Sequence, residues 1–200
     1  MKCRVVSRPK PGLKVSVCAD EDEEDRAYFF LDQGKKQLAA LEALRIDTGP
    51  HARNGPVLVS DSAHVADPKN WSKGFGTMLY EAGLKLACEE GRAFRSSSTR
   101  SVFSESFWRK QADKGRAVCV ADRPGFYHRL PLEVDLEEAH EAGELDTATY
   151  EAIRARVAPL AEEARAAKSD WRCNHYRIDN ACLTPTLKGL RGRKGKRGRR

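Results

Sequence analysis

The sequence predicts one α/β domain of the α+β kind, built on a mixed, mostly antiparallel twisted sheet with helices on both faces. With 200 residues, the chain is long enough for one substantial core. Short segments that alternate apolar and polar residues recur in the first 120 residues, as strands do. A strand, a glycine turn and a helix follow one another at 57–91, which is typical of a sheet covered by helices.

The first 46 residues are predicted to form short strands followed by a helix. Residues 3–7 and 13–19 alternate as strands do, and 27–31 is aromatic enough for a third, although it could also open the next helix. Leucines at 38, 41 and 44 recur at roughly helical spacing, so 33–45 is predicted to be an amphipathic helix. Six consecutive acidic residues at 20–25 indicate a solvated loop.

The central segment has the clearest pattern. Residues 57–65 alternate as a strand, with Asp61 on the apolar side, which indicates either a functional acid or a β-bulge. A helix is predicted from the glycines at 74 and 76 to about residue 90, where Gly91 offers a left-handed stop. Two further strands are expected at 93–97 and 116–121, on either side of a helix at 101–113.

The last third is predicted to be mainly helical. Residues 126–134 are expected to be extended and 136–142 to form a short helix. A longer helix, capped by Asp146 or Thr147, should reach about residue 168, with Pro159 breaking or kinking it. The predicted organisation is one domain at 1–185, with a cofactor-binding core at 56–120 and a helical extension at 136–168, followed by a basic, disordered tail at 186–200.

The cysteine pattern favours reduced thiols in a cytoplasmic protein. No two of the six cysteines have CxxC spacing, and there is no apolar run for a signal peptide or a membrane helix. Cys173, His175 and Cys182 offer three soft ligands, but their spacing matches no common zinc finger. We therefore expect packed thiols and no metal site.

The C-terminal tail carries the basic character of the chain. Residues 188–200 contain eight lysines and arginines and no acid, while the rest of the chain is close to neutral. Such a segment suits sequence-independent contact with nucleic acid or an acidic partner, and the alternative is an inert, solvated tail. The candidate contact residues are Arg191, Arg193, Lys194, Lys196, Arg197, Arg199 and Arg200.

The glycine turn at 74–77 carries the chemistry. A turn of this kind that opens a helix exposes unpaired amides and the positive end of the helix dipole, where a phosphate can bind. A dinucleotide-binding turn would need a third glycine where Leu79 stands, and no Walker A lysine follows the second glycine. Neither of these two phosphate-binding motifs fits the turn, so the surrounding elements must discriminate between families.

Residues 56–120 resemble the GNAT superfamily of N-acetyltransferases. The family's loop runs Gln/Arg-x-x-Gly-x-Gly/Ala between a strand and a helix, and here the glycines are Gly74 and Gly76. A strand ending in polar residues, a helix with an aromatic near its end and a strand after a glycine follow in the family's order. Trp71 and Trp108 stand where the family has Gln or Arg and, commonly, a tyrosine that protonates the leaving thiolate.

The resemblance implies where acetyl-CoA would bind, with backbone amides at about 72–77 holding its pyrophosphate. The pantetheine arm would lie between the strand before the loop and the strand after the helix, which diverge in the family. The implied cofactor-binding residues are Val65, Ser72, Lys73, Gly74, Phe75, Gly76, Thr77, Ser96, Ser97 and Ser101. Candidates for the group that takes the proton from the attacking amine are Asp61, His64 and Tyr127.

Two functions follow as expectations. The first is transfer of an acetyl group from acetyl-CoA to an unidentified amine, by direct attack within a ternary complex as the family implies. The alternative is a binding protein, in which a catalytically weak or inactive GNAT-like body serves as a scaffold and the basic tail binds nucleic acid or an acidic partner.

Overall fold

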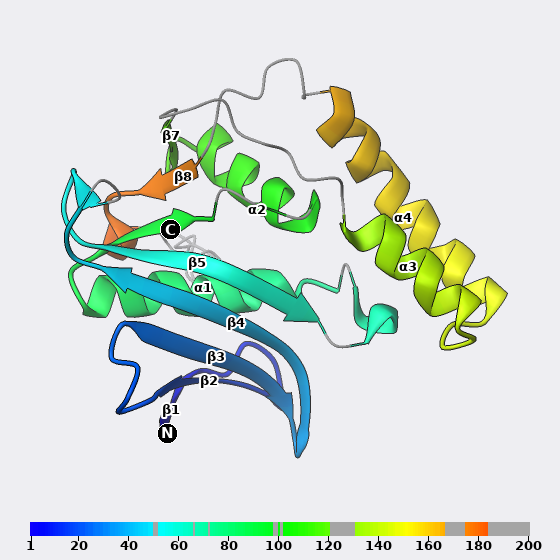
Figure 1. Cartoon of the computed structure of the whole chain (residues 1–200), viewed down its shortest axis with the longest axis horizontal. Helices are drawn as coiled ribbons and strands as arrows, with labels where there is room; N and C mark the ends of the chain where they lie inside the picture. The colour runs from blue at the N-terminus through cyan, green and yellow to red at the C-terminus, as the bar shows by residue number, and fades with distance from the viewer. Residues whose placement is uncertain are drawn as a thin grey trace, which may run out of the picture.

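An eight-stranded open sheet, mixed but mostly antiparallel, runs through the described part of this computed structural model (Figure 1). The structure describes residues 1–49, 52–65, 67–71, 73–97, 100, 102–120, 131–166 and 175–183. The strand order is β1-β2-β3-β4-β5-β6-β8-β7, in which β5 and β6 are parallel. The predicted mixed α/β class is therefore confirmed.

The elements have the following bounds. The strands are β1 (Lys2–Ser7), β2 (Leu13–Ala19), β3 (Arg26–Gln33), β4 (Lys36–Ile46), β5 (Val57–Val65), β6 (Ala93–Ser96), β7 (Val118–Val120) and β8 (His175–Ile178). The helices are α1 (Phe75–Glu89), α2 (Val102–Asp113), α3 (Pro131–Glu141) and α4 (Thr147–Ala166), with short 3-10 turns η2 (Pro68–Asn70) and η4 (Ala181–Leu183).

Strand β4 stands where the sequence predicted an amphipathic helix at 33–45, so that prediction was wrong. Gly34, with a φ of 60°, turns the chain between β3 and β4, which then pair antiparallel. The register shifts near the start of β4, where Leu38 is the extra residue of a β-bulge. Because a bulge offsets the inward alternation by one residue, Leu38 and Leu41 are both buried although they are three residues apart.

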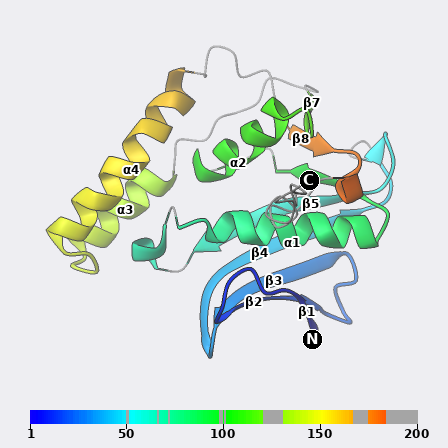
Figure 2. The ribbon, with the colours of Figure 1, turned by 180° about the vertical axis from the view of Figure 1, so that it is seen from behind.

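Helices α1 and α2 share one face of the sheet. Figure 2 shows α1 lying across β4 and β5. Rings of Tyr80 in α1 and Trp108 in α2 lie 6.5 Å and 5.3 Å from the ring of Phe94 in β6, centroid to centroid. On the other face, the small core cluster around Val57 and Ala93 includes no residue of the described helices. The predicted placement of helices on both faces is therefore not found in the described part of the chain.

The close approach of α1 to the sheet depends on Gly83. A Cβ at this position would lie 2.8 Å from Cζ of Phe94, which is fully buried. We expect Gly83→Ala to lower the free energy of unfolding by about 1 kcal/mol, because a steric cost of roughly 2 kcal/mol exceeds the gain in helix propensity of roughly 1 kcal/mol. Denaturant unfolding measures the change. Gly76→Ala is the control, since nothing lies within 4 Å of its added Cβ, and a more stable Gly83→Ala protein would contradict the tight packing.

Helices α3 and α4 form the predicted helical extension, a hairpin beyond the end of β5 (Figure 1). The helix α3 begins at Pro131, so the extended prediction for 126–134 is wrong at 131–134 and otherwise lies outside the described residues. Proline suits the first turn of a helix, where an amide has no intrahelical partner. Asp146 caps α4 as predicted, because its Oδ1 accepts from the amide of Thr149 at 2.8 Å. Within the described ranges, no helix is long and apolar enough to cross a bilayer.

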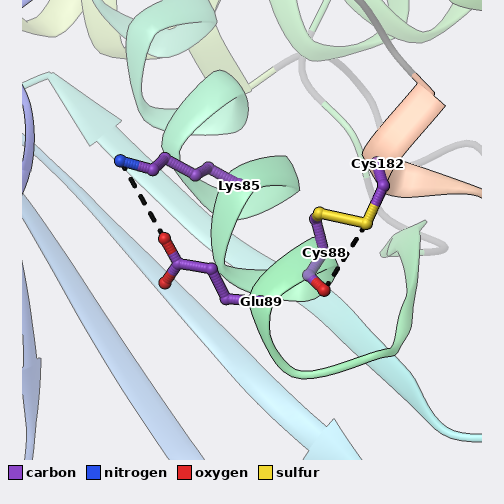
Figure 3. The surroundings of a disulfide bond; sticks show 4 residues. All are labelled: Lys85, Cys88, Glu89 and Cys182. Carbon is purple, nitrogen blue, oxygen red and sulfur yellow. Dashed lines mark hydrogen bonds and ion pairs between the residues drawn. A yellow bond between two sulfur atoms is a disulfide. The ribbon is translucent and has the colours of Figure 1, made fainter.

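Disulfide bonds stand where the sequence predicted reduced thiols. Cys3 and Cys18, opposite each other in the register of β1 and β2, are bonded, and Cys88 of α1 is bonded to Cys182 of η4 (Figure 3). Cys119 is also disulfide-bonded. The prediction failed because partners up to 94 residues apart meet only in the fold. Disulfides persist in oxidising compartments, so the cysteines do not support the predicted cytoplasmic location, and Cys182 is not available as a zinc ligand.

Candidate functional site

The candidate site lies where the parallel strands β5 and β6 stop pairing. Their register ends at Ser60↔Ser96, and the amide of Ser97 donates to the carbonyl of Ser60 at 3.0 Å. Strand β5 nevertheless continues to Val65, and its exposure changes at the same point: its first four residues are buried and the next four are exposed. We call residues 61–65 of β5, together with the end of β6 at 96–97, the strand split.

A β-bulge at Asp61 adjoins the strand split. Glu42 of β4 is opposite Ser62, and Ala43 is opposite Ser60, so Asp61 is the extra residue of this register. A bulge bends the strand that carries it and increases its twist. Here the bend follows the last pair with β6 directly. Of the two alternatives for Asp61, the structure supports the bulge, and its exposed carboxylate is still available to act as a base.

The helix α1 begins beyond the strand split with an open N-terminus. Gly74 is left-handed, with a φ of 83°, and no side chain caps the helix. The carbonyl of Gly74 accepts the first helical bond, from the amide of Met78 at 3.1 Å, so the three amides at 75–77 precede the intrahelical ladder. A Cβ at Gly74 or Gly76 would meet nothing within 4 Å. The turn is therefore open to an anion, which the helix dipole would stabilise.

Trp71 fastens the loop that joins β5 to α1. Its indole N–H donates to the carbonyl of Val65 at 3.1 Å, and its ring is buried among residues of the α3/α4 hairpin, including Leu136 and Ile153. Trp71, which the resemblance aligned with a Gln or Arg, thus has a structural role. Lys73, exposed beside the turn, donates from Nζ to Oδ1 of Asn70 at 3.0 Å. Trp71 therefore anchors the loop that precedes the amides at 75–77.

The predicted base His64 lies on the face of the sheet opposite α1. Its neighbour Val65 pairs with Ala39 and packs with the main core under α1, and successive strand residues point to opposite faces. The side chain of His64 is exposed. The amides at 75–77 lie on α1, so the split separates the candidate anion site from the candidate base.

A buried polar network lies at the end of β6, and the sequence did not single it out. We call it the Arg100 network, and its members are Ser96, Arg100, Glu105, Arg109 and Tyr176. Arg100 donates from Nε to Oε2 of Glu105 at 2.7 Å, and both side chains are at most 3% exposed. Only the Glu105 and Arg109 pair, four residues apart on α2, was visible as a helical ion pair in the sequence.

Tyr176 joins the Arg100 network to the sheet. Its amide donates to Oγ of Ser96 at 2.9 Å, and its hydroxyl donates to Oε1 of Glu105 at 2.7 Å. Burial, and then the charge of Glu105, raise the pKa of Tyr176 to about 12, so the hydroxyl is protonated at neutral pH. Trp108 stacks on its ring with a centroid distance of 6.2 Å. Trp108, which the resemblance aligned with an acid tyrosine, is fully buried in the core.

The structure brings together part of the predicted site. Val65, Asp61 and His64 on β5 and the serines at 96–97 belong to the strand split, and the loop after β5 leads to the amides at 75–77 at the start of α1. Four predictions lie outside the described residues: Ser72, Ser101, Tyr127 and the basic tail. No protein-family model matches the chain, and the search of curated proteins finds no relative of it.

Proposed function

We propose that the protein is an acyl-CoA-dependent N-acetyltransferase that transfers an acetyl group from acetyl-CoA to an amine. One observation carries the proposal. Strand β5 continues beyond the end of its parallel partner β6, and the loop after β5 leads directly to the open N-terminus of α1. The GNAT resemblance of 56–120 implies this combination. A diphosphate fits the open amides, and an extended amide-bearing arm fits the unpaired stretch of β5.

The residues divide the work as follows. The amides at 75–77 would hold the pyrophosphate, assisted by the positive charge of Lys73. Backbone groups at 61–65 would bind the pantetheine arm as an added strand, since this edge of β5 faces the strand split. Asp61 and His64 are the described candidates for accepting the proton of the attacking amine, directly or through water. Acetyl-CoA supplies the activated acyl group.

A second candidate function is that of a weak catalyst or a scaffold, and Trp108 is the observation that favours it. Its indole is fully buried against Tyr176 and Phe94, and an indole N–H is a very poor acid. Tyr176 cannot readily take its place, because its hydroxyl already donates to Glu105. In this alternative the body binds CoA without efficient transfer, and the basic tail provides the contact with nucleic acid or an acidic partner.

A ligand-binding experiment tests the proposal. We expect CoA at 100 times its Kd to stabilise the protein by about 2.7 kcal/mol, measured as a rise in the unfolding temperature. Gly76→Leu should weaken CoA binding by at least about tenfold, because the side chain would fill the space over the amides. The apo variant should fold, since nothing lies within 4 Å of the added Cβ, and its unfolding temperature without CoA is the baseline for the shift.

The matched control is Lys110→Leu, which adds the same side chain at an exposed position in the last turn of α2. It should leave CoA binding unchanged. Absence of any stabilisation by CoA or acetyl-CoA in the unmodified protein would refute the proposed function. If CoA binds but free thiol is not released from acetyl-CoA in the presence of a mixture of amines, the scaffold alternative gains.

A further inference from the structure

The strand split has an unexpected feature on its β6 side. In a regular parallel ladder, Ser97 would donate to Ser60 and then accept, through its carbonyl, from the amide two residues further along β5. The first bond is present, at 3.0 Å. The carbonyl instead accepts from Nη1 of Arg100 at 2.6 Å. The residue that would have supplied the amide, Ser62, lies opposite Glu42 of β4.

We propose that Arg100 is a positioning residue that ends the β5–β6 ladder and holds the strand split open. Its Nη1 binds the Ser97 carbonyl at 2.6 Å, the acceptor to which the next interstrand bond would be directed, and competes with the amide of β5 for it. The use of the split for acyl-CoA rests on the proposed function, whereas the role of Arg100 in keeping the strands apart does not. The bulge at Asp61 diverts β5, and Arg100 fixes the end of β6.

The Arg100 network prevents the guanidinium from moving away. Nε of Arg100 is bonded to Glu105, and Nη1 donates to Oγ of Ser96 at 3.1 Å as well as to Ser97. The guanidinium carbon lies 5.0 Å from the ring centroid of Tyr176. A hydrogen bond between buried charges is strong, and breaking it leaves an uncompensated charge in a low-dielectric interior. Arg100 is therefore held in one orientation.

Arginine is required for this arrangement because its donors point in several fixed directions. The planar fork can face Glu105 through one edge and the end of β6 through another. Lysine has a single ammonium group on a flexible chain, which can pair with Glu105 but cannot reach the same set of acceptors. Arg100→Lys therefore keeps the charge balance of the network while freeing the Ser97 carbonyl. This makes it the discriminating substitution.

Hydrogen exchange followed by mass spectrometry tests the proposal. In Arg100→Lys the amide of Ser62 no longer competes with Arg100 for the Ser97 carbonyl, so we expect the peptide that contains residues 61–65 to exchange more slowly, by about fivefold at the amide of Ser62. Simple destabilisation would instead speed up exchange. Arg154→Lys, an exposed position on α4, is the control and should leave exchange in β5 unchanged. Unchanged or faster exchange of 61–65 in Arg100→Lys would overturn the proposal.

Affinity for CoA provides the second readout. Closure of the split should weaken CoA binding by about tenfold in Arg100→Lys, with no change in Arg154→Lys. If Arg100→Lys does not fold, Arg100→Met combined with Glu105→Gln removes both charges, leaves an acceptor for Tyr176, and should slow exchange in the same residues. If the unmodified protein does not bind CoA, the proposed function fails, while the exchange result still decides the role of Arg100.

Discussion

Replacing Cys88 and Cys182 together by alanine is expected to lower the free energy of unfolding by about 4 kcal/mol. The disulfide closes a loop of 94 residues that includes β6, α2, β7, α3, α4 and β8. Cross-linking so long a loop restricts the unfolded chain strongly. Denaturant unfolding under non-reducing conditions measures the loss, and reduction of the unmodified protein should produce a loss at least as large.

The ion pairs of Glu89 at the end of α1 cannot replace this disulfide. Glu89 is paired with Lys85 (Figure 3) and Arg4, but these side chains are all at least 36% exposed. Exposed pairs typically contribute about 0–1 kcal/mol.

Alanines at Cys3 and Cys18 provide the comparison, because that bond closes a loop of 15 residues. The expected loss is about 3 kcal/mol. A larger loss at this pair than at Cys88 and Cys182 would contradict the loop-length argument.

Local patterns in the sequence predicted most of the sheet. The strand at 57–65, the helix from the glycine turn to Gly91 and the alternating N-terminal strands are found with nearly the predicted bounds. The failure at β4 has a definite cause, because a bulge brings Leu38 and Leu41 to the same face at a spacing that also fits a helix. Bulges arise from pairing between strands, which a single segment does not reveal.

Part of the candidate site could likewise be predicted from local sequence patterns, and part of it could not. The glycine turn can be recognised locally, since its glycines and the helix after it are contiguous. The Arg100 network joins residues 96, 100, 105 and 109 to residue 176, and that last member arrives on a strand inserted beside β6. The disulfide partners of 88 and 182 are a similar case. Contacts across such distances depend on the order of strands in the sheet, which the spacing of residues does not encode.

The Arg100 network leads to the second large effect. Glu105→Ala is expected to lower the free energy of unfolding by about 3–5 kcal/mol, because it leaves the guanidinium of Arg100 buried without its carboxylate. Tyr176 also loses the acceptor of its hydroxyl, while Arg109, which is 26% exposed, can turn toward solvent. Denaturant unfolding gives the value. Glu151→Ala is the control, since its pair with Arg154 is about 60% exposed on both sides, and the change there should be within about 0.5 kcal/mol.

A second substitution distinguishes two contributions to the free energy of unfolding: the destabilisation caused by an unpaired buried charge, and the stabilisation provided by the Arg100–Glu105 ion pair. Arg100→Met in the Glu105→Ala background removes the stranded guanidinium, so we expect the double variant to be more stable than Glu105→Ala alone by at least about 1 kcal/mol. If the two changes were additive, with each lowering stability independently, Arg100 and Glu105 would not act as a unit. Arg100 would then keep its place at the end of β6 through Ser96 and Ser97 rather than through Glu105.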